Sequence, residues 1–165
     1  MAFGQLPYRA LNCEREAMRF AVPAPMRARL DEYERFHRSR ANELCHFLGI
    51  PSIVVGAAGL LALVQLGTPL PGHLTLAELV AGAIVIFYVA SARWLGVVTG
   101  ALLAALVLVG RALPWSAALG LFLGGWVLQF LGHAVYEKSS PAFLRNLLHL
   151  LVGPAWLVER AFGRI

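Results

Sequence analysis

The chain has 165 residues, of which 59% are hydrophobic and only 14% are charged, and its mean hydropathy is +0.68. Soluble domains carry about 25% charged residues, so the composition indicates one small membrane domain and excludes a separate soluble catalytic unit. The net charge of +5 comes almost entirely from arginine. Beside apolar segments, it indicates membrane lipids as partners and argues against nucleic acid.

The N-terminal region is the most polar part of the chain. Residues 1–26 contain Pro7, Pro23 and Pro25, which break any long helix, and we expect them to form an irregular or interfacial lead. The next stretch, 27–46, is rich in charge, and its first half is typical of an amphipathic helix lying along a membrane surface. We therefore expect a single membrane domain over residues 27–165.

Four apolar segments predict four transmembrane helices in an all-α, polytopic protein. They lie at about 44–66, 74–92, 94–113 and 115–136, and a helix needs about 20 residues to cross the hydrocarbon core. Glycine pairs at short spacing predict close helix packing, namely Gly56/Gly59, Gly96/Gly100 and Gly120/Gly124. Residues 142–162 are apolar but interrupted by charges and Pro154, which indicates interfacial or re-entrant C-terminal helices.

The basic residues predict the orientation. Five arginines precede the first span, namely Arg27, Arg29, Arg35, Arg38 and Arg40, and the first loop has none. Four basic residues follow the fourth span, namely Lys138, Arg145, Arg160 and Arg164. The positive-inside rule places both termini in the cytoplasm, with Arg111 as a minor exception. Arginine- and alanine-rich usage suggests a bacterial inner membrane, or the endoplasmic reticulum membrane if the source is eukaryotic.

Four of the five histidines then fall on one membrane face, at the end of the first span (His37, His46) and around the end of the fourth (His133, His149). A single histidine there is readily explained as a hydrogen-bonded interfacial residue, but the group favours a metal site. Imidazole is a common ligand whose second nitrogen needs an orienting partner, and imidazoles suit iron or zinc. The available partners are Asn42, Gln129, Glu137 and Glu159.

Two separated blocks carry a resemblance to a known family. They are His37-x4-Asn42-x3-His46-x2-Gly49-Ile-Pro51 and Trp126-x2-Gln129-Phe-x-Gly132-His133-x3-Glu137-x3-Pro141-Ala142. Together they resemble the Mpo1-like membrane proteins over about residues 33–162. The resemblance implies an iron(II)-dependent dioxygenase that uses O2 to shorten 2-hydroxy fatty acids by one carbon, in α-oxidation. It also implies His37, His46 and His133 as iron ligands, with His149, outside the motif, ranked fourth.

Two departures from the family pattern leave the substrate details open: Lys-Ser-Ser after Glu137, and Arg145 before Asn146. A 2-hydroxy acid could chelate iron through its carboxylate and hydroxyl, with its acyl tail between apolar spans. Glu137 could orient a ligand, bind iron itself or cap a helix end. Three cations could steer the carboxylate or could simply set topology and contact lipid: Arg38, Arg40 and Lys138.

Two other functions stay open at this point. The chain could be a non-enzymatic membrane protein whose polar face binds lipid or a partner, or a haem protein with histidine axial ligands. The dioxygenase interpretation makes one strict structural demand, which is that the ends of the first and fourth spans meet on one face.

Overall fold

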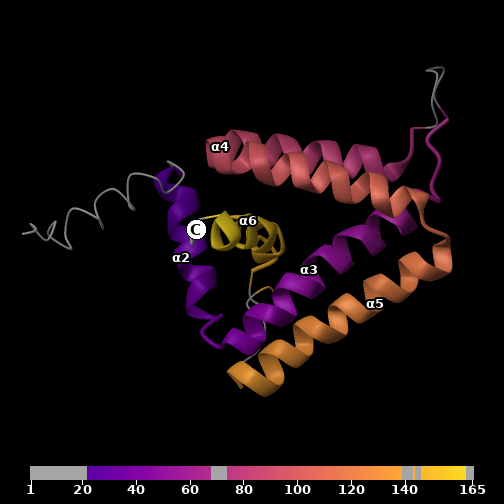
Figure 1. Cartoon of the computed structure of the whole chain (residues 1–165). Coiled ribbons are helices and arrows are strands. Elements are labelled where there is room, and N and C mark those ends of the chain that lie inside the picture. The colour runs from indigo at the N-terminus through magenta and orange to yellow at the C-terminus, as the bar shows by residue number, and fades with distance from the viewer. Residues whose placement is uncertain (1–21, 68–73, 139–142, 144–145, 163–165) are drawn as a thin grey trace, which may run out of the picture.

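The computed structural model describes residues 22–67, 74–138, 143 and 146–162. These residues form α2 (Ala24–Arg35), α3 (Arg40–Leu61), α4 (Leu76–Ala112), α5 (Trp115–Leu131), the π-helix η1 (Gly132–Glu137) and α6 (His149–Phe162), as Figure 1 shows. The described part contains no β-strand, only an isolated bridge between Gln65 and Thr75. The predicted all-α class is therefore confirmed.

α4 reverses direction at Arg93, whose φ of 50° and ψ of −125° are not helical. A Cβ added to Gly96 would collide with the carbonyl of Tyr88, and one added to Gly100 would lie 3.2 Å from Cγ1 of Val85. The two halves of α4 therefore lie antiparallel and side by side (Figure 1). They correspond to the second and third predicted spans.

Three helices are long and apolar enough to cross a membrane: Arg40–Leu61, Leu76–Arg111 and Trp115–Glu137. This supports an integral membrane protein. The count of four spans is not confirmed, because both halves of α4 fall within one of these three helices. It stays a prediction that depends on whether each half crosses by itself.

α3 is the central helix and packs along α5 and against α4. Glycine allows a close approach to α5, since a Cβ added to Gly125 would lie 2.7 Å from the carbonyl oxygen of Gly49. The prediction that Gly120 and Gly124 pack against a neighbour was wrong, because nothing lies within 4 Å of a Cβ at either position. Those glycines lie on another face of α5, and sequence spacing alone does not show which face meets α3.

α2 and α6 cover the end of α3 that carries the histidines. Met26, Leu30 and Tyr33 form the buried stripe of amphipathic α2, and they pack in one core with Trp156 of α6. α2 begins at Ala24 because proline suits the first positions of a helix. α6 has 14 residues, about 21 Å of helix, which is too short to cross a bilayer.

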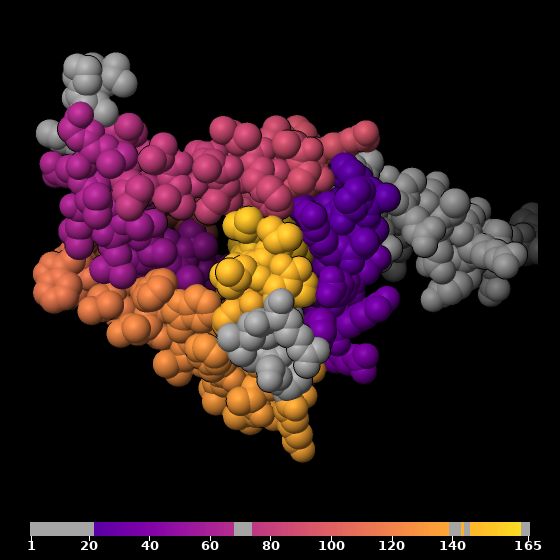
Figure 2. Space-filling view, turned by 180° about the vertical axis from the view of Figure 1, so that it is seen from behind, coloured from indigo at the N-terminus to yellow at the C-terminus, as the bar shows by residue number. Residues whose placement is uncertain are grey.

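Ion pairs fix these helices to one another at the same end of the molecule. Arg27 of α2 lies 2.6 Å from Glu159 of α6, and Arg160 of α6 lies 2.7 Å from Glu43 of α3 and 2.7 Å from Glu34 of α2. These ion pairs thus hold α2, α3 and α6 together without involving the histidine cluster. Figure 2 shows α6 seated between α2 on one side and α5 on the other.

Candidate metal centre

Three histidines from three chain segments meet in the interior. His37 lies in the turn between α2 and α3, His46 in α3 and His133 in η1. Their exposed fractions are 2%, 1% and 2%, and one ring nitrogen from each lies within 4.8 Å of the others. The ends of the first and last apolar helices therefore meet, as the sequence interpretation required.

Backbone carbonyls fix the orientation of two of the rings. Nδ1 of His37 lies 2.6 Å from the carbonyl oxygen of Tyr33, and Nδ1 of His46 lies 2.9 Å from that of Asn42. A carbonyl only accepts hydrogen bonds, so each Nδ1 carries the proton and each Nε2 of the neutral ring is left with a lone pair. This arrangement is the usual way in which proteins orient metal-binding imidazoles.

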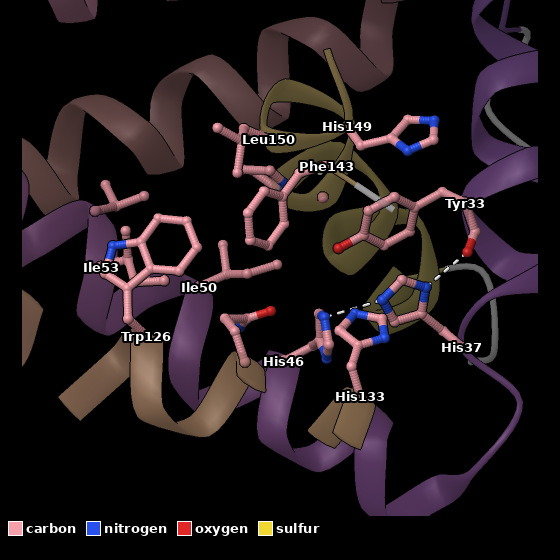
Figure 3. Close-up of a pocket in the computed structure, with 14 residues that line it drawn as sticks. Tyr33, His37, His46, Ile50, Ile53, Trp126, His133, Phe143, His149 and Leu150 are labelled. Carbon is pink, nitrogen blue, oxygen red and sulfur yellow. Dashed lines mark hydrogen bonds between the residues drawn. The ribbon is translucent and has the colours of Figure 1, made fainter. Parts of the chain in front are cut away.

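The two Nε2 atoms of His37 and His46 lie 2.9 Å apart (Figure 3). With both Nδ1 protons committed to carbonyls, neither Nε2 can donate to the other, and two lone pairs face each other. Burial, and next the neighbouring His46, lower the pKa of His37, so a shared proton is disfavoured. A metal cation removes the repulsion.

The donor set also fits a metal in its geometry. Two imidazole nitrogens bound at right angles, each about 2.1 Å from an ion, lie about 3.0 Å apart, close to the observed separation. The ring of His133 stands at 74° to that of His37 and at 89° to that of His46. Its Nδ1 is buried without a hydrogen-bond partner in the described part of the chain. Three steeply inclined imidazoles can therefore bind one side of an ion and leave the other side open.

Glu137 connects η1 to the turn that carries His37. Its Oε1 accepts hydrogen bonds from the backbone N–H groups of Arg38 and Ser39, both at 2.7 Å, and from Nδ2 of Asn42 at 3.2 Å. Ser39 is the N-cap of α3 but makes no side-chain cap, so a carboxylate from another helix satisfies these donors. Of the three roles open to Glu137, this geometry supports capping and positioning.

Gly132 makes this approach of η1 to α3 possible. A Cβ added to Gly132 would collide with Oδ1 of Asn42. Asn42 is fully buried, and it contacts the site twice, through its carbonyl on His46 and through its amide on Glu137. Asn42 therefore contacts both His46 and Glu137, and its supporting role at the site stays a prediction.

A cavity of ≈ 150 Å³ adjoins the three histidines. Tyr33 lies near the histidines, and the apolar side chains of Ile53 and Trp126 lie at the opposite end (Figure 3). Gln129 also lines the cavity, and its Nε2 is buried without a hydrogen-bond partner in the described residues. Since an unpaired buried donor is costly, the cavity fits a ligand with oxygen acceptors.

His149 lines the same cavity but is not part of the three-histidine group. Neither of its buried ring nitrogens makes a hydrogen bond within the described residues, and its Nε2 lies 3.6 Å from a carboxylate oxygen of Glu32. Its ring lies edge-on to Tyr33, with centroids 6.0 Å apart. The structure thus places His149 at the wall of the cavity rather than in the cluster.

Four other predicted site residues do not line the cavity in the described structure. Arg38, Arg40 and Lys138 are exposed, and Glu159 pairs with Arg27. Conversely, Tyr33 stacks on His37 with ring centroids 4.1 Å apart, a contact that sequence reasoning missed. Its position four residues before His37 was the available signal, but it was absorbed into the pattern of an amphipathic helix.

Comparison with known proteins agrees with this geometry. The family model described as "2-hydroxy-palmitic acid dioxygenase Mpo1-like" matches residues 24–165. The 2-hydroxy-palmitic acid dioxygenase MPO1 of Saccharomyces cerevisiae is 31% identical over 127 residues, which cover 77% of this chain and 73% of the yeast protein. No solved structure matches. The chain therefore belongs to the Mpo1-like family.

Proposed function

We propose that this protein is an iron(II)-dependent dioxygenase that shortens 2-hydroxy fatty acids by one carbon. The observation that carries the proposal is the pair of lone-pair nitrogens, on His37 and His46, that face each other 2.9 Å apart beside the buried His133. The 31% identity to a 2-hydroxy-palmitic acid dioxygenase supports the reaction class.

His37, His46 and His133 would hold the metal. Three neutral imidazoles suit iron or zinc, and they leave the charge of the ion uncompensated, which favours binding of a substrate carboxylate. Iron(II), when bound, supplies the electron transfer with which O2 and the substrate react. All three rings are buried, with exposed fractions of 2% or less.

The remaining polar groups suit the head of a 2-hydroxy acid. The amide Nε2 of Gln129 is an unpaired donor at the cavity, so it would bind an oxygen of the substrate. Tyr33 lines the same cavity, and burial raises the pKa of its hydroxyl, which keeps the hydroxyl protonated as a donor. Both side chains would orient the carboxylate and the hydroxyl relative to the histidines.

The overall reaction needs no further reductant. A 2-hydroxy acid and one molecule of O2 balance to the acid one carbon shorter, one CO2 and one water. No second organic substrate has to fit beside the fatty acid, which agrees with a cavity of only ≈ 150 Å³. That volume suits a group about the size of benzene.

The same geometry disfavours a haem protein. Axial ligands lie on opposite faces of the haem iron, about 4 Å apart at ordinary metal–nitrogen distances, with the macrocycle between them. The Nε2 atoms of His37 and His46 are closer than that. A lipid- or partner-binding protein without catalysis is separated from the enzyme by the experiment below.

The test uses purified protein in detergent, loaded with iron(II) without oxygen and then given O2 and 2-hydroxypalmitate. We expect pentadecanoic acid and CO2 in equal amounts, with one O2 consumed per product. Protein loaded with zinc and protein with His133→Ala should form neither. If iron-loaded protein retains one iron per chain and binds the fatty acid but consumes no O2, the oxygenase proposal fails.

The orientation in the membrane is part of the same proposal. We infer that both termini face the cytoplasm and that α2 lies along the surface, so that the histidines are at the cytoplasmic mouth of the helices; a bacterial inner membrane fits the composition. Labelling of single cysteines introduced at Arg29 and at Gln65 tests this in intact cells. A membrane-impermeant reagent should reach only the residue 65 variant.

A further inference from the structure

A second cavity lies next to the histidine cavity, between α3, α4 and α6. Its volume is ≈ 190 Å³, and its walls are apolar apart from Thr99. The hydroxyl of Thr99 donates to the carbonyl of Leu95 at 2.7 Å, so it offers no free donor to a ligand. Only an apolar ligand matches such walls. The site residues discussed above do not explain this cavity.

The two cavities are separated by a partition of three side chains that line both of them: Ile50, Val54 and Pro154. Ile50 and Val54 are four residues apart on one face of α3, and Pro154 comes from α6. The histidines lie on one side of this partition and a wholly apolar volume lies on the other. A small rearrangement of the partition would join them.

The histidine cavity is too small to hold a long-chain ligand, so part of the chain must extend out of it. A cavity of about 150 Å³ holds a benzene-sized group, enough for the polar head and the first carbons of a fatty acid. Aromatic rings pack together at the Trp126 side of that cavity, where Trp126 and Phe143 lie with centroids 5.1 Å apart and Phe130 lies 6.1 Å from Phe143. The partition, in contrast, adjoins a second apolar volume that can take the rest of the chain.

The far end of the second cavity reaches the surface that faces lipid. Leu102 of α4 and Phe162 of α6 line it, and they are 45% and 52% exposed. An alkyl chain that started at the histidines and crossed the partition would thus end at the acyl chains of the bilayer. Such a path would let a membrane-dissolved substrate enter from the side.

We propose that the α3–α4–α6 cavity binds the alkyl chain of the substrate and is its lateral entrance from the membrane. The proposal rests on the proposed function in one respect, namely that the substrate is a 2-hydroxy fatty acid. Burying one methylene group is worth about a fourfold gain in affinity. The cavity therefore sets the preference for chain length, while the histidine cavity recognises the head group.

The kinetic test compares 2-hydroxy acids from 2-hydroxyoctanoate to 2-hydroxystearate. In the wild-type protein, kcat/KM should rise about fourfold per methylene until the path is full. Leu106 lines the cavity, so Leu106→Trp places a large ring in it and should lower kcat/KM progressively more as the chain lengthens, which flattens this rise. Leu108→Trp is the matched control, because Leu108 is 66% exposed and is not among the lining residues. It should keep the wild-type profile.

A binding test does not depend on turnover. A 2-hydroxy fatty acid with a diazirine near its methyl end should label α4 around Leu102 and α6 around Phe162. Leu106→Trp should reduce that labelling at least fivefold, and Leu108→Trp should not. This measurement remains possible if the protein turns over no 2-hydroxy acid, which would sink the proposed function alone.

Three results would overturn the inference about the cavity. One is labelling at Trp126 on α5 instead, which would mean that the chain leaves by the other end. Another is equal labelling by a phospholipid that carries the same diazirine chain, which would mean that the cavity binds membrane lipid without preference for the fatty acid. The third is a uniform loss of kcat/KM at every chain length in Leu106→Trp, which would indicate general damage.

Discussion

Replacing Glu137 separates its three possible roles. Its carboxylate accepts two backbone hydrogen bonds at 2.7 Å, from Arg38 and Ser39. Hydrogen bonds to a charged group contribute about 1.5–3 kcal/mol each and neutral ones about 0.5–1.5 kcal/mol. Glu137→Gln keeps a carbonyl acceptor and loses the charge, so we expect a loss of about 2 kcal/mol. Glu137→Ala removes the acceptor, and water can replace it only in part, so about 3 kcal/mol should be lost.

The measurements are thermal unfolding of the metal-free protein in detergent and the affinity for iron(II) or a spectroscopic substitute. For a chain of this length, about 2 kcal/mol lowers the Tm by roughly 4–8 °C. If Glu137 positions the turn, Glu137→Gln keeps one metal per chain with affinity within several-fold of wild type. Glu137→Ala frees His37 and weakens metal binding about 10–100-fold. A different result would show that Glu137 is a metal ligand and refute this reasoning. In that result, Glu137→Gln loses the metal as completely as Glu137→Ala does, while the Tm of the metal-free protein is unchanged.

Three further predictions use the same two measurements. His133→Ala should abolish stoichiometric metal binding while His149→Gln retains it; equal loss in both would mean that the centre has four histidines. Gly132→Ala places a methyl group against α3, so it should lower the free energy of unfolding by more than 2 kcal/mol and weaken metal binding. The control Gly124→Ala has open space around it, so it should be neutral or stabilise the protein by up to about 1 kcal/mol. Similar effects of the two substitutions would contradict the packing argument. Arg93→Gly relieves a positive φ of 50° and should raise the unfolding free energy by about 1 kcal/mol, whereas a lower Tm would show that the Arg93 side chain has contacts that matter more.

Sequence patterns predicted the features that depend on local composition. Apolar runs located the helices because each segment in lipid must satisfy its own backbone hydrogen bonds, which favours a helix wherever such a run occurs. The histidines were found because polar groups at the ends of such runs are few. The placement of His37, His46 and His133 in one cluster needed more than composition, and it came from the two blocks that resemble the Mpo1-like family.

What could not be predicted depends on how helices rotate against one another. The end of the fourth predicted span, 115–136, was expected to be helical, but from Gly132 on it is the π-helix η1, which turns side chains by a different angle from an α-helix. The contact of Glu137 with the start of α3 was therefore not evident from the sequence. In the same way, hydropathy did not show that Gly125 rather than Gly124 faces α3.

Charge alone was also an ambiguous guide. Arg38, Arg40 and Lys138 are near the histidines in sequence, yet their exposed side chains lie outside the cavity lining. Basic residues beside an apolar run serve topology and lipid contact equally well. Gln129, an uncharged donor, does line the cavity, and a count of charges ignores it.

The hydrogen bond between Arg38 and Glu137 joins residues 99 positions apart, and this separation has a consequence for biosynthesis. At about 5–20 residues per second, a ribosome needs roughly 5–20 s to make the chain between the two halves of the centre. During that interval, His37 and His46 have been translated and the third imidazole has not. A metal ion can gather its three ligands only after α5 and η1 have entered the membrane and reached α3. If the three histidines hold a metal, its loading is therefore a late step of maturation, and nascent chains that stall before η1 should be released without metal.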